Sequence, residues 1–270
     1  MATLPNPLPK LASLGLRLPP GGLIDATVDG PWHEPLLWLA DDRAAPGDWA
    51  ALRRTAPSVG LLPVVLDVGA GHGRPELWEL MPGEMSYPGD HDAEEVLEEF
   101  WDEYAEEDAD WPGLAGTEGA DDDTDLEPAG SADSAEPAES VASDIVDSLL
   151  DGGGPLKDPR LALVPARRSA DIPTAIGWMG PANHENDTGR LSAVLRSWED
   201  RFGIRVVALG FDTLLVSVAA PPTTLAEAEA LAAEHFAFCP DNIWQGSDPT
   251  LTAYAAHQLL NQPAWHFWWD

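Results

Sequence analysis

Cysteine and positively charged residues are scarce in this chain of 270 residues, which has one Cys and 14 Lys and Arg residues against 47 Asp and Glu residues. A single Cys excludes an intramolecular disulfide framework and a zinc site built from several cysteines. No apolar run reaches the roughly 18 residues of a membrane-spanning helix, and the first residues lack the basic start and apolar stretch of a signal peptide. These absences predict a soluble, cytoplasmic protein without a membrane partner.

The formal net charge of −33 is concentrated in one part of the chain. Residues 90–151 hold 24 of the 47 acidic residues, and no Lys or Arg occurs between Arg74 and Lys157. A nucleic-acid-binding face needs clustered Lys and Arg side chains, so we expect no nucleic-acid partner bound through a basic surface. The acidic stretch is either a solvated linker, a mimic of DNA or a surface for a basic protein partner.

The composition divides the chain into three parts. Residues 1–89 are rich in Pro and contain short apolar runs, which predict a small β-rich region. Residues 90–156 form an acidic linker with one amphipathic helix over 94–107, whose apolar stripe includes Trp101. That stripe either packs on its own domain or docks in a partner's groove. Residues 112–140 have too few apolar side chains to fold, and one helical turn is expected near 145–150.

Residues 157–270 have the pattern of a compact α+β domain with the element order β-α-β-β-α-α-β. A helix over 188–202 separates the first two strands, which favours a parallel crossover, and a tight turn at Asp212 predicts a hairpin. Thr224 and Glu227 form a capping box that starts the next helix. A helix over about 249–260 and a strand over 265–269 follow. We expect a sandwich with helices on one face of a mixed sheet.

A glycine-rich turn follows the apolar run at residues 64–68. Its sequence matches the first motif of S-adenosylmethionine-dependent methyltransferases, with Asp67, Gly69, Gly71 and Gly73 as candidate cofactor-binding residues. No long amphipathic helix and no second strand ending in an acidic ribose ligand follow it. The simpler interpretation is a strand followed by a flexible turn, so no cofactor is expected.

The lone Cys239 has a polar neighbourhood. His235 precedes it by four residues, on the same helical face, and Asp241 and Asn242 follow it. A His beside a Cys can generate a nucleophilic thiolate, which makes these four residues catalytic candidates. The alternative is a small buried residue at the end of a helix. The seven His residues lack the spacing of a metal site, so no metal is expected.

Aromatic residues gather at the end of the chain. A strand there places Trp265, Phe267 and Trp269 on one side, and His266 and Trp268 on the other. One side is expected to face the core, and the other lies under a helix or lines a groove. Because Trp is common in interaction hot spots, the candidate binding residues combine these aromatics with nearby polar groups. They are Trp101, Trp198, Asp212, Trp244, Trp268 and Asp270.

Four segments in order, residues 191–203, 209–214, 233–242 and 267–270, resemble a family of bacterial proteins that is common in high-GC actinobacteria. The segments include the pattern Cys239-Pro240-Asp241-Asn242, followed by Phe267-Trp268-Trp269-Asp270, and the four segments in this order are specific. The resemblance covers about residues 160–270. The family is a domain of unknown function, so the resemblance implies no activity, cofactor or catalytic residue.

These observations favour a non-enzymatic interaction module, such as an adaptor or an immunity-like binder of a basic partner. The acid-rich helix around Trp101 and the linker would steer the partner electrostatically. The alternative is an enzyme or small-molecule-binding domain with its site at His235, Cys239, Asp241 and Asn242. S-adenosylmethionine binding at the glycine-rich turn is the weaker alternative.

Overall fold

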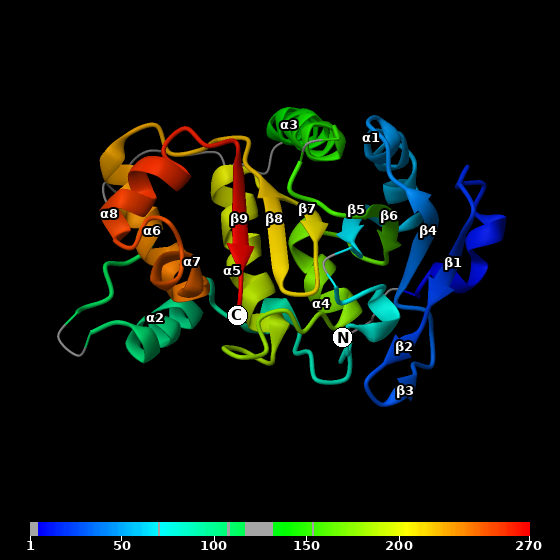
Figure 1. Ribbon diagram of the computed structural model, residues 1–270, viewed down its shortest axis with the longest axis horizontal. Coiled ribbons are helices and arrows are strands. Elements are labelled where there is room, and N and C mark those ends of the chain that lie inside the picture. Colours follow the sequence, from blue (N-terminus) through cyan, green and yellow to red (C-terminus); the bar gives the residue numbers. More distant parts are fainter. Residues whose placement is uncertain (1–4, 70, 107–108, 117–131, 153) are drawn as a thin grey trace.

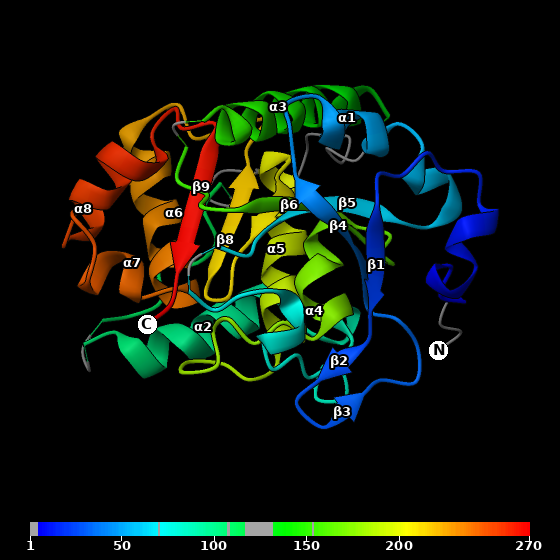
Figure 2. The same ribbon diagram turned by 45° about the vertical axis from the view of Figure 1, so that its right-hand side comes forward.

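A computed structural model describes residues 5–69, 71–106, 109–116, 132–152 and 154–270. Within these ranges the centre of the molecule is a mixed sheet of seven strands, with helices on both sides (Figures 1 and 2). Its strands are β1 (Gly21–Ile24), β4 (Leu37–Arg43), β5 (Leu62–Asp67), β6 (Pro159–Val164), β7 (Arg205–Leu209), β8 (Thr213–Ser217) and β9 (Ala264–Trp268). A separate small hairpin pairs β2 (Ala26–Thr27) with β3 (Gly30–Pro31).

The helices differ widely in length, and the longer ones pack on the sheet or on each other. The α-helices are α1 (Asp48–Arg53), α2 (Ala93–Tyr104), α3 (Ala132–Leu150), α4 (Ile172–Ile176), α5 (Thr188–Phe202), α6 (Leu225–Phe238), α7 (Asp241–Trp244) and α8 (Leu251–Tyr254). The π-helical segment η6 (Ala255–Leu259) continues α8. Short 3₁₀ turns are η1 (Leu8–Ser13), η2 (Ala56–Val59), η3 (Pro75–Leu77), η4 (Pro88–Asp90) and η5 (Ser169–Asp171).

The strand order is β1-β4-β6-β5-β7-β8-β9, and every neighbouring pair is antiparallel except β5 and β7. The mixed sheet and the order β-α-β-β-α-α-β after residue 157 are confirmed, as is the hairpin of β7 and β8. The predicted parallel crossover from β6 to β7 is wrong. The wholly buried strand β5 inserts between them, antiparallel to β6 and parallel to β7. Residues 1–89 and 157–270 therefore contribute strands to one sheet.

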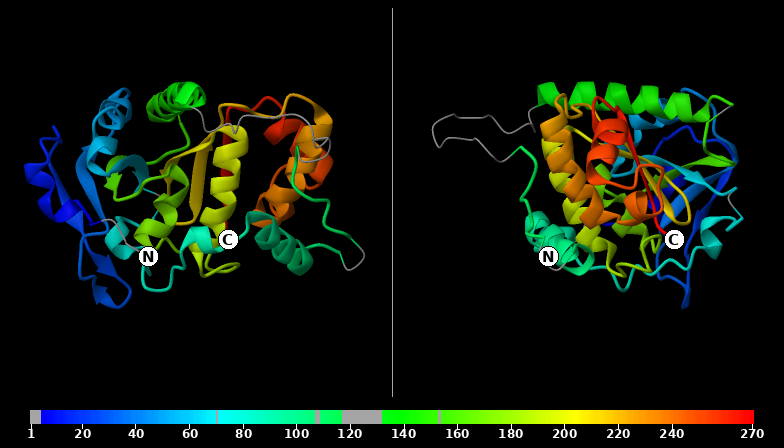
Figure 3. Two further views of the ribbon diagram at one scale, coloured as in Figure 1. Left: turned by 180° about the vertical axis from the view of Figure 1, so that it is seen from behind. Right: turned by 60° about the vertical axis from the view of Figure 1, so that its left-hand side comes forward.

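Both faces of the sheet are covered, rather than the one face expected. The sheet separates two hydrophobic cores, and successive side chains of β6 point into one and then the other. Ala162 and Val164 lie in the larger core with α2, α4, α5 and α6. Leu161 and Leu163 lie in the smaller core with α1 and α3. Figure 3 shows α3 along one side of the molecule and α2 along the opposite side. One side of β9 faces the larger core, as expected, and it is the side of Trp265, Phe267 and Trp269, which are all buried there.

Helix α3 extends well beyond the single turn that the sequence predicted. Its buried stripe is Ala138, Ala142, Val146 and Leu150, at intervals of four residues. Glu139 on the same helix binds Arg53 at 2.5 Å and Arg205 at 2.7 Å. Small side chains make this stripe hard to detect by hydropathy, although they fit closely against a sheet. Residues 132–140, within the range interpreted as disordered, belong to α3, whereas residues 117–131 lie outside the described residues.

Helix α2 packs on its own protein, as the first of the two interpretations predicted. Asp92 caps it by accepting hydrogen bonds from the backbone N–H groups of Glu94 and Glu95. Its apolar stripe, which includes Phe100 and Trp101, is buried against α5 and α6. Within the described part of the chain, no helix combines the length and the apolar character needed to cross a membrane.

Candidate functional site

The turn between α6 and α7 is fastened to the edge strand β9 by Asn242 and Cys239. The Asn242 Nδ2 atom donates to the carbonyl oxygen of His266 at 2.7 Å, and its Oδ1 atom accepts from the N–H of Trp268 at 3.1 Å. The Cys239 thiol donates to the carbonyl oxygen of Trp268 at 3.0 Å. An edge strand needs partners for its outward backbone groups, and the Asn242 amide takes the place of a further strand.

Asp241 completes this clamp. It is 3% exposed and accepts hydrogen bonds from the backbone N–H of Asp270 at 3.0 Å, from Gln245 at 2.9 Å and from His184 at 2.9 Å. Burial alone would raise the pKa of Asp241, but these donors hold it below its ordinary value. The polar residues of the Cys239–Asn242 motif thus all bind the backbone of the closing segment. The sequence located these residues, and the structure gives them a structural role.

The structure does not equip Cys239 as a nucleophile. The thiol is fully buried, and that burial raises its pKa. His235 is also fully buried, and its Nδ1 atom lies 3.1 Å from the Tyr254 hydroxyl. Among the described residues the His235 and Cys239 side chains share no hydrogen bond, although the backbone N–H of Cys239 donates to the carbonyl oxygen of His235 at 2.9 Å. No group of three or more His, Cys, Asp or Glu side chains in the described residues could hold a metal ion. A reactive thiolate needs the opposite environment, namely partial exposure and a nearby positive charge.

The predicted binding residues fall into buried and accessible groups. Trp101 and Trp198 are 6% and 0% exposed, so both lie in the core. Asp212 lies in the turn after β7, where its carbonyl oxygen accepts from the N–H of Trp269 at 3.1 Å. Trp244 is 54% exposed. Trp268 and Asp270 follow the clamp at the edge of the sheet, with Trp268 half-buried and Asp270 exposed.

The outer face of β9 forms the floor of a hollow, which is one of the two outcomes that the sequence left open for this face. Its volume is about 310 Å³, at the lower end of small-molecule sites. Three lining residues belong to β9, namely Ala264, His266 and Trp268, and the others are Asp241, Asn242, Gly246, Ser247, Asp248, Tyr254 and Gln258. The structure thus brings Asp241, Asn242 and Trp268 to the lining of one hollow, where Asp241 itself is 3% exposed.

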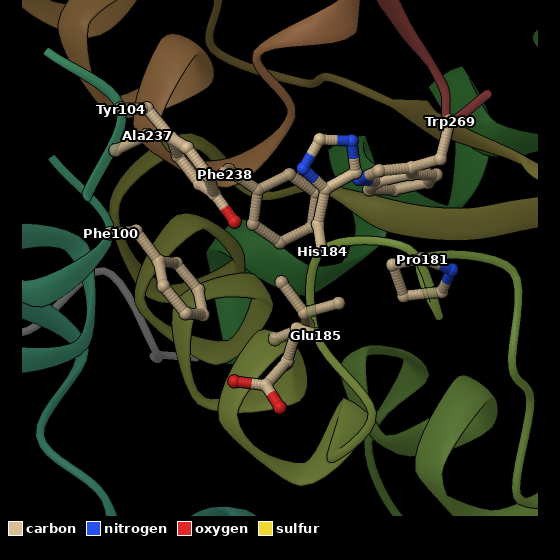
Figure 4. Close-up of a pocket in the computed structure, with 9 residues that line it drawn as sticks. Phe100, Tyr104, Pro181, His184, Glu185, Ala237, Phe238 and Trp269 are labelled. Atoms are coloured by element: carbon tan, nitrogen blue, oxygen red, sulfur yellow. The ribbon is translucent and has the colours of Figure 1, made fainter.

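A second depression lies between α2 and the loop before α5 (Figure 4). Figure 4 shows Tyr104 and His184 beside the ring of Phe238, Trp269 next to His184, and Glu185 apart from these rings. The rings of Tyr104 and His184 meet edge to face, with centroids 5.5 Å apart. Burial, followed by the charge of Glu103, raises the pKa of Tyr104 to about 12, so its hydroxyl stays protonated at neutral pH. The crevice has no room for a water molecule, so it is a packing seam.

A buried ion pair between α5 and α6 was not predicted from the sequence. Glu234 is fully buried and binds Arg201 through both carboxylate oxygens, at 2.8 and 2.5 Å. The same carboxylate accepts from Trp198 Nε1 at 2.7 Å and from the N–H of Ala115 at 2.7 Å. The available signal was Glu234, which with His235 interrupts the apolar run 231–238, because an acid there needs a buried partner.

The glycine-rich turn after β5 has structural contacts of its own. Asp67 accepts hydrogen bonds from the N–H groups of Lys157 at 2.9 Å, Asp158 at 2.7 Å and Gly69 at 3.2 Å. Gly71 and Gly73 have positive φ angles of 94° and 70°, which favour glycine. Only the short turn η3 follows, rather than a long helix. Asp67 thus fastens the turn to the segment before β6, and the positive φ angles explain the glycines at positions 71 and 73.

Replacing Gly69 by Ala is expected to destabilise the protein by about 1–3 kcal/mol. An added Cβ would lie 2.6 Å from the backbone N of Asp158 and 2.7 Å from the Cβ of Lys157. Gly22→Ala is the matched control, since a Cβ there meets nothing within 4 Å. Urea unfolding followed by Trp fluorescence measures both variants. Equal midpoints would contradict a structural need for Gly69.

In the comparison with known proteins, one family model matches the C-terminal part of this chain. Residues 160–270 match the model of a family described as a domain of unknown function (DUF4253). The search of curated proteins and the search of solved structures each returned no match to the chain. The matched range begins inside β6 and runs through β9, so β1, β4 and β5 of the same sheet lie outside it. The C-terminal part of the chain thus carries an uncharacterised domain, and the family description assigns it no activity.

Proposed function

We propose that this protein is a non-enzymatic interaction module that binds a basic protein partner through the outer face of α2 and the adjacent Trp244. The supporting observation is the division of α2 into a buried apolar face and an exposed acidic one. The exposed acids are Glu94, Glu95, Glu98, Glu99, Asp102 and Glu103. Among the described residues one of these six forms an ion pair, Glu99 with Arg190.

Trp244 supplies an apolar anchor beside this charge. It is 54% exposed, and its ring meets the ring of Tyr104 on α2 edge to face, with centroids 5.9 Å apart. Helices α2 and α7 lie side by side (Figures 1 and 2). An exposed Trp beside a group of charges of the same sign is typical of a protein-binding surface. The ring is buried when the partner binds, and the charges raise the association rate. The anchor in this proposal is therefore Trp244 rather than the buried Trp101.

The compartment follows from the same proposal. An interaction module with a single free thiol suits a reducing environment, and we place it in the cytoplasm. Small-molecule binding is the second candidate function, supported by the hollow at β9. The buried Cys239 and His235 give little support to the catalytic form of that alternative.

The test reverses charge on α2 without removing it, because deletion of residues 90–151 would also remove core side chains of α2 and α3. The test variant carries Glu95→Lys, Glu98→Lys and Asp102→Lys. The control carries Asp144→Lys, Asp151→Lys and Glu229→Lys, which change three exposed acids elsewhere by the same net charge. Partners are captured from host lysate on the immobilised full-length protein at low and high salt, and the association rate of the captured protein is then measured.

The expected result is a partner whose capture is lost at high salt and in the α2 variant but retained in the control. Its association rate should fall at least about tenfold in the α2 variant, and Trp244→Ala should mainly increase its dissociation rate. Equal losses in the two charge variants would mean that net charge alone attracts the partner. That outcome, or the absence of any salt-sensitive partner, would overturn the proposal.

A further inference from the structure

The hollow at the outer face of β9 is negatively charged at its walls. Asp241 and Asp248 are the two carboxylates among its lining residues, which include neither Lys nor Arg. Asp248 accepts hydrogen bonds from His257 at 2.6 Å and from Gln258 at 2.7 Å. These bonds, first the one from His257, lower the pKa of Asp248, so it is ionised at neutral pH. Because Asp241 is 3% exposed, an anionic ligand would chiefly meet the Asp248 carboxylate here, and it would meet no Lys or Arg in the lining.

Two residues with aromatic side chains line the hollow from β9. His266 and Trp268 lie on the side of the strand opposite Trp265 and Phe267, and His266 is exposed whereas Trp268 is half-buried. Desolvation lowers the pKa of His266 although the charge of Asp212 acts in the opposite direction, which favours the neutral imidazole. Among the described residues, neither ring forms a side-chain hydrogen bond. Both rings are therefore available to a ligand, and neither brings a positive charge.

The wall opposite the clamp has an irregular backbone. Tyr254 ends α8, and Gln258 belongs to the π-helical segment η6. Segments of π-helix are uncommon and occur frequently at functional sites, because the extra residue moves side chains out of the ordinary helical register. Here that segment places Gln258 at the hollow, next to Asp248.

We propose that this hollow binds a small organic cation, with the ammonium group over the Trp268 ring and near the Asp248 carboxylate. A cation is attracted by the face of an indole ring and by a nearby carboxylate, and both lie in the same hollow. The volume of about 310 Å³ fits a small molecule rather than a peptide or a nucleotide. This site is separate from the acidic face of α2 and does not depend on a protein partner.

Choline and its uncharged isostere 3,3-dimethylbutan-1-ol test the inference on the full-length protein. They share shape and hydroxyl group and differ in the quaternary nitrogen. Isothermal titration calorimetry and ligand-observed NMR measure binding of each. We expect choline to bind at least about tenfold more tightly than the alcohol, since the cation–π and carboxylate contacts together contribute about 1.4 kcal/mol or more. Equal affinities, or no binding of choline, would overturn the proposal.

Three variants locate the site. Trp268→Leu removes the aromatic floor, and Asp248→Asn removes the charge while keeping the shape. Each is expected to weaken choline binding about tenfold. Trp244→Leu is the control, because it changes an exposed Trp that does not line the hollow, and it should leave choline binding unchanged. If Trp268→Leu does not fold, the Asp248→Asn variant and the comparison of the two ligands still test whether the hollow binds the cation. Loss of binding in Trp244→Leu alone would place the cation elsewhere.

Discussion

Replacing Glu234 by Ala is expected to lower the free energy of unfolding by about 3–5 kcal/mol. The substitution leaves the Arg201 guanidinium, which is 20% exposed, without its carboxylate partner. It also leaves Trp198 Nε1 and the N–H of Ala115 without their acceptor. Breaking one half of a buried pair costs far more than the pair contributes, because the remaining charge stays desolvated. Urea unfolding at pH 7 measures the difference.

Two further variants separate the buried charge from a general effect on α6. Glu229→Ala removes an exposed acid from the same helix and should change stability by less than about 0.5 kcal/mol. The double variant Arg201→Met with Glu234→Leu removes both charges and should regain most of the loss, since apolar replacements of a buried pair are often neutral or stabilising. A loss below about 1 kcal/mol in Glu234→Ala would show that Arg201 is solvated after the substitution.

This ion pair also bears on the proposed docking face. Arg201 Nη1 donates to the carbonyl oxygen of Ala115 at 3.0 Å, so the pair holds the segment 109–116 that follows α2. Trp101 Nε1 donates to the carbonyl oxygen of Ala109 at 2.8 Å in the same segment. The acidic helix is thus fixed at its end by buried contacts. The negative charges on α2 therefore keep a constant geometry relative to one another. The same charges on a flexible linker would not.

Much of the fold could be predicted because its signals are local. The capping box of Thr224 and Glu227 is present in the structure, and Asp187 caps α5 through the N–H of Gly189. Gly203 ends α5 with a φ angle of 61°. Alternation along β9 correctly divided its residues between a core side and an outer side. Each of these features depends on residues within a few positions of one another.

The remainder depends on contacts between distant parts of the chain. β5 precedes β6 by about 90 residues and pairs with it as well as with β7, which no local pattern indicates. The buried stripe of α3 includes the small side chains of Ala138 and Ala142, which add little to the hydropathy of this segment. The composition of the segment therefore resembled that of a linker. The count of charged residues located the acidic segment. Only the structure shows that the apolar faces of its helices α2 and α3 pack in the hydrophobic cores.

In the candidate site, too, the local features could be predicted from the sequence and the long-range contacts could not. The sequence placed Cys239, Asp241 and Asn242 together and grouped them with Trp268 and Asp270 through the family resemblance. It did not indicate that these polar groups bind the backbone of the closing strand. Paired Cys and His residues suggested nucleophilic chemistry, but their burial, which spacing does not determine, gives them a structural role.

Acidification from pH 7 to pH 5 is expected to destabilise the wild-type protein by about 2 kcal/mol more than the variant His235→Phe. Burial, and secondly the charge of Arg201, lowers the pKa of His235 well below its ordinary value of 6.5. The folded protein therefore keeps the ring neutral, whereas the unfolded chain binds a proton as the pH falls below 6.5. Stability due to this residue is complete above pH 6.5 and falls by about 1.4 kcal/mol per pH unit below it.

The phenyl ring in His235→Phe would lie among Trp198, Trp265 and Phe267, whose ring centroids are 4.8, 4.7 and 4.8 Å from that of the imidazole. The variant also loses the hydrogen bond to Tyr254, at a cost of about 1 kcal/mol that does not depend on pH. Tyr254→Phe is the matched control, because it removes that bond and leaves the imidazole in place. Its free energy of unfolding, measured from pH 7 to pH 5, should run parallel to that of the wild type. The profile of His235→Phe should be flatter. Three parallel profiles would mean that the folded protein binds a proton at His235 as readily as the unfolded chain does.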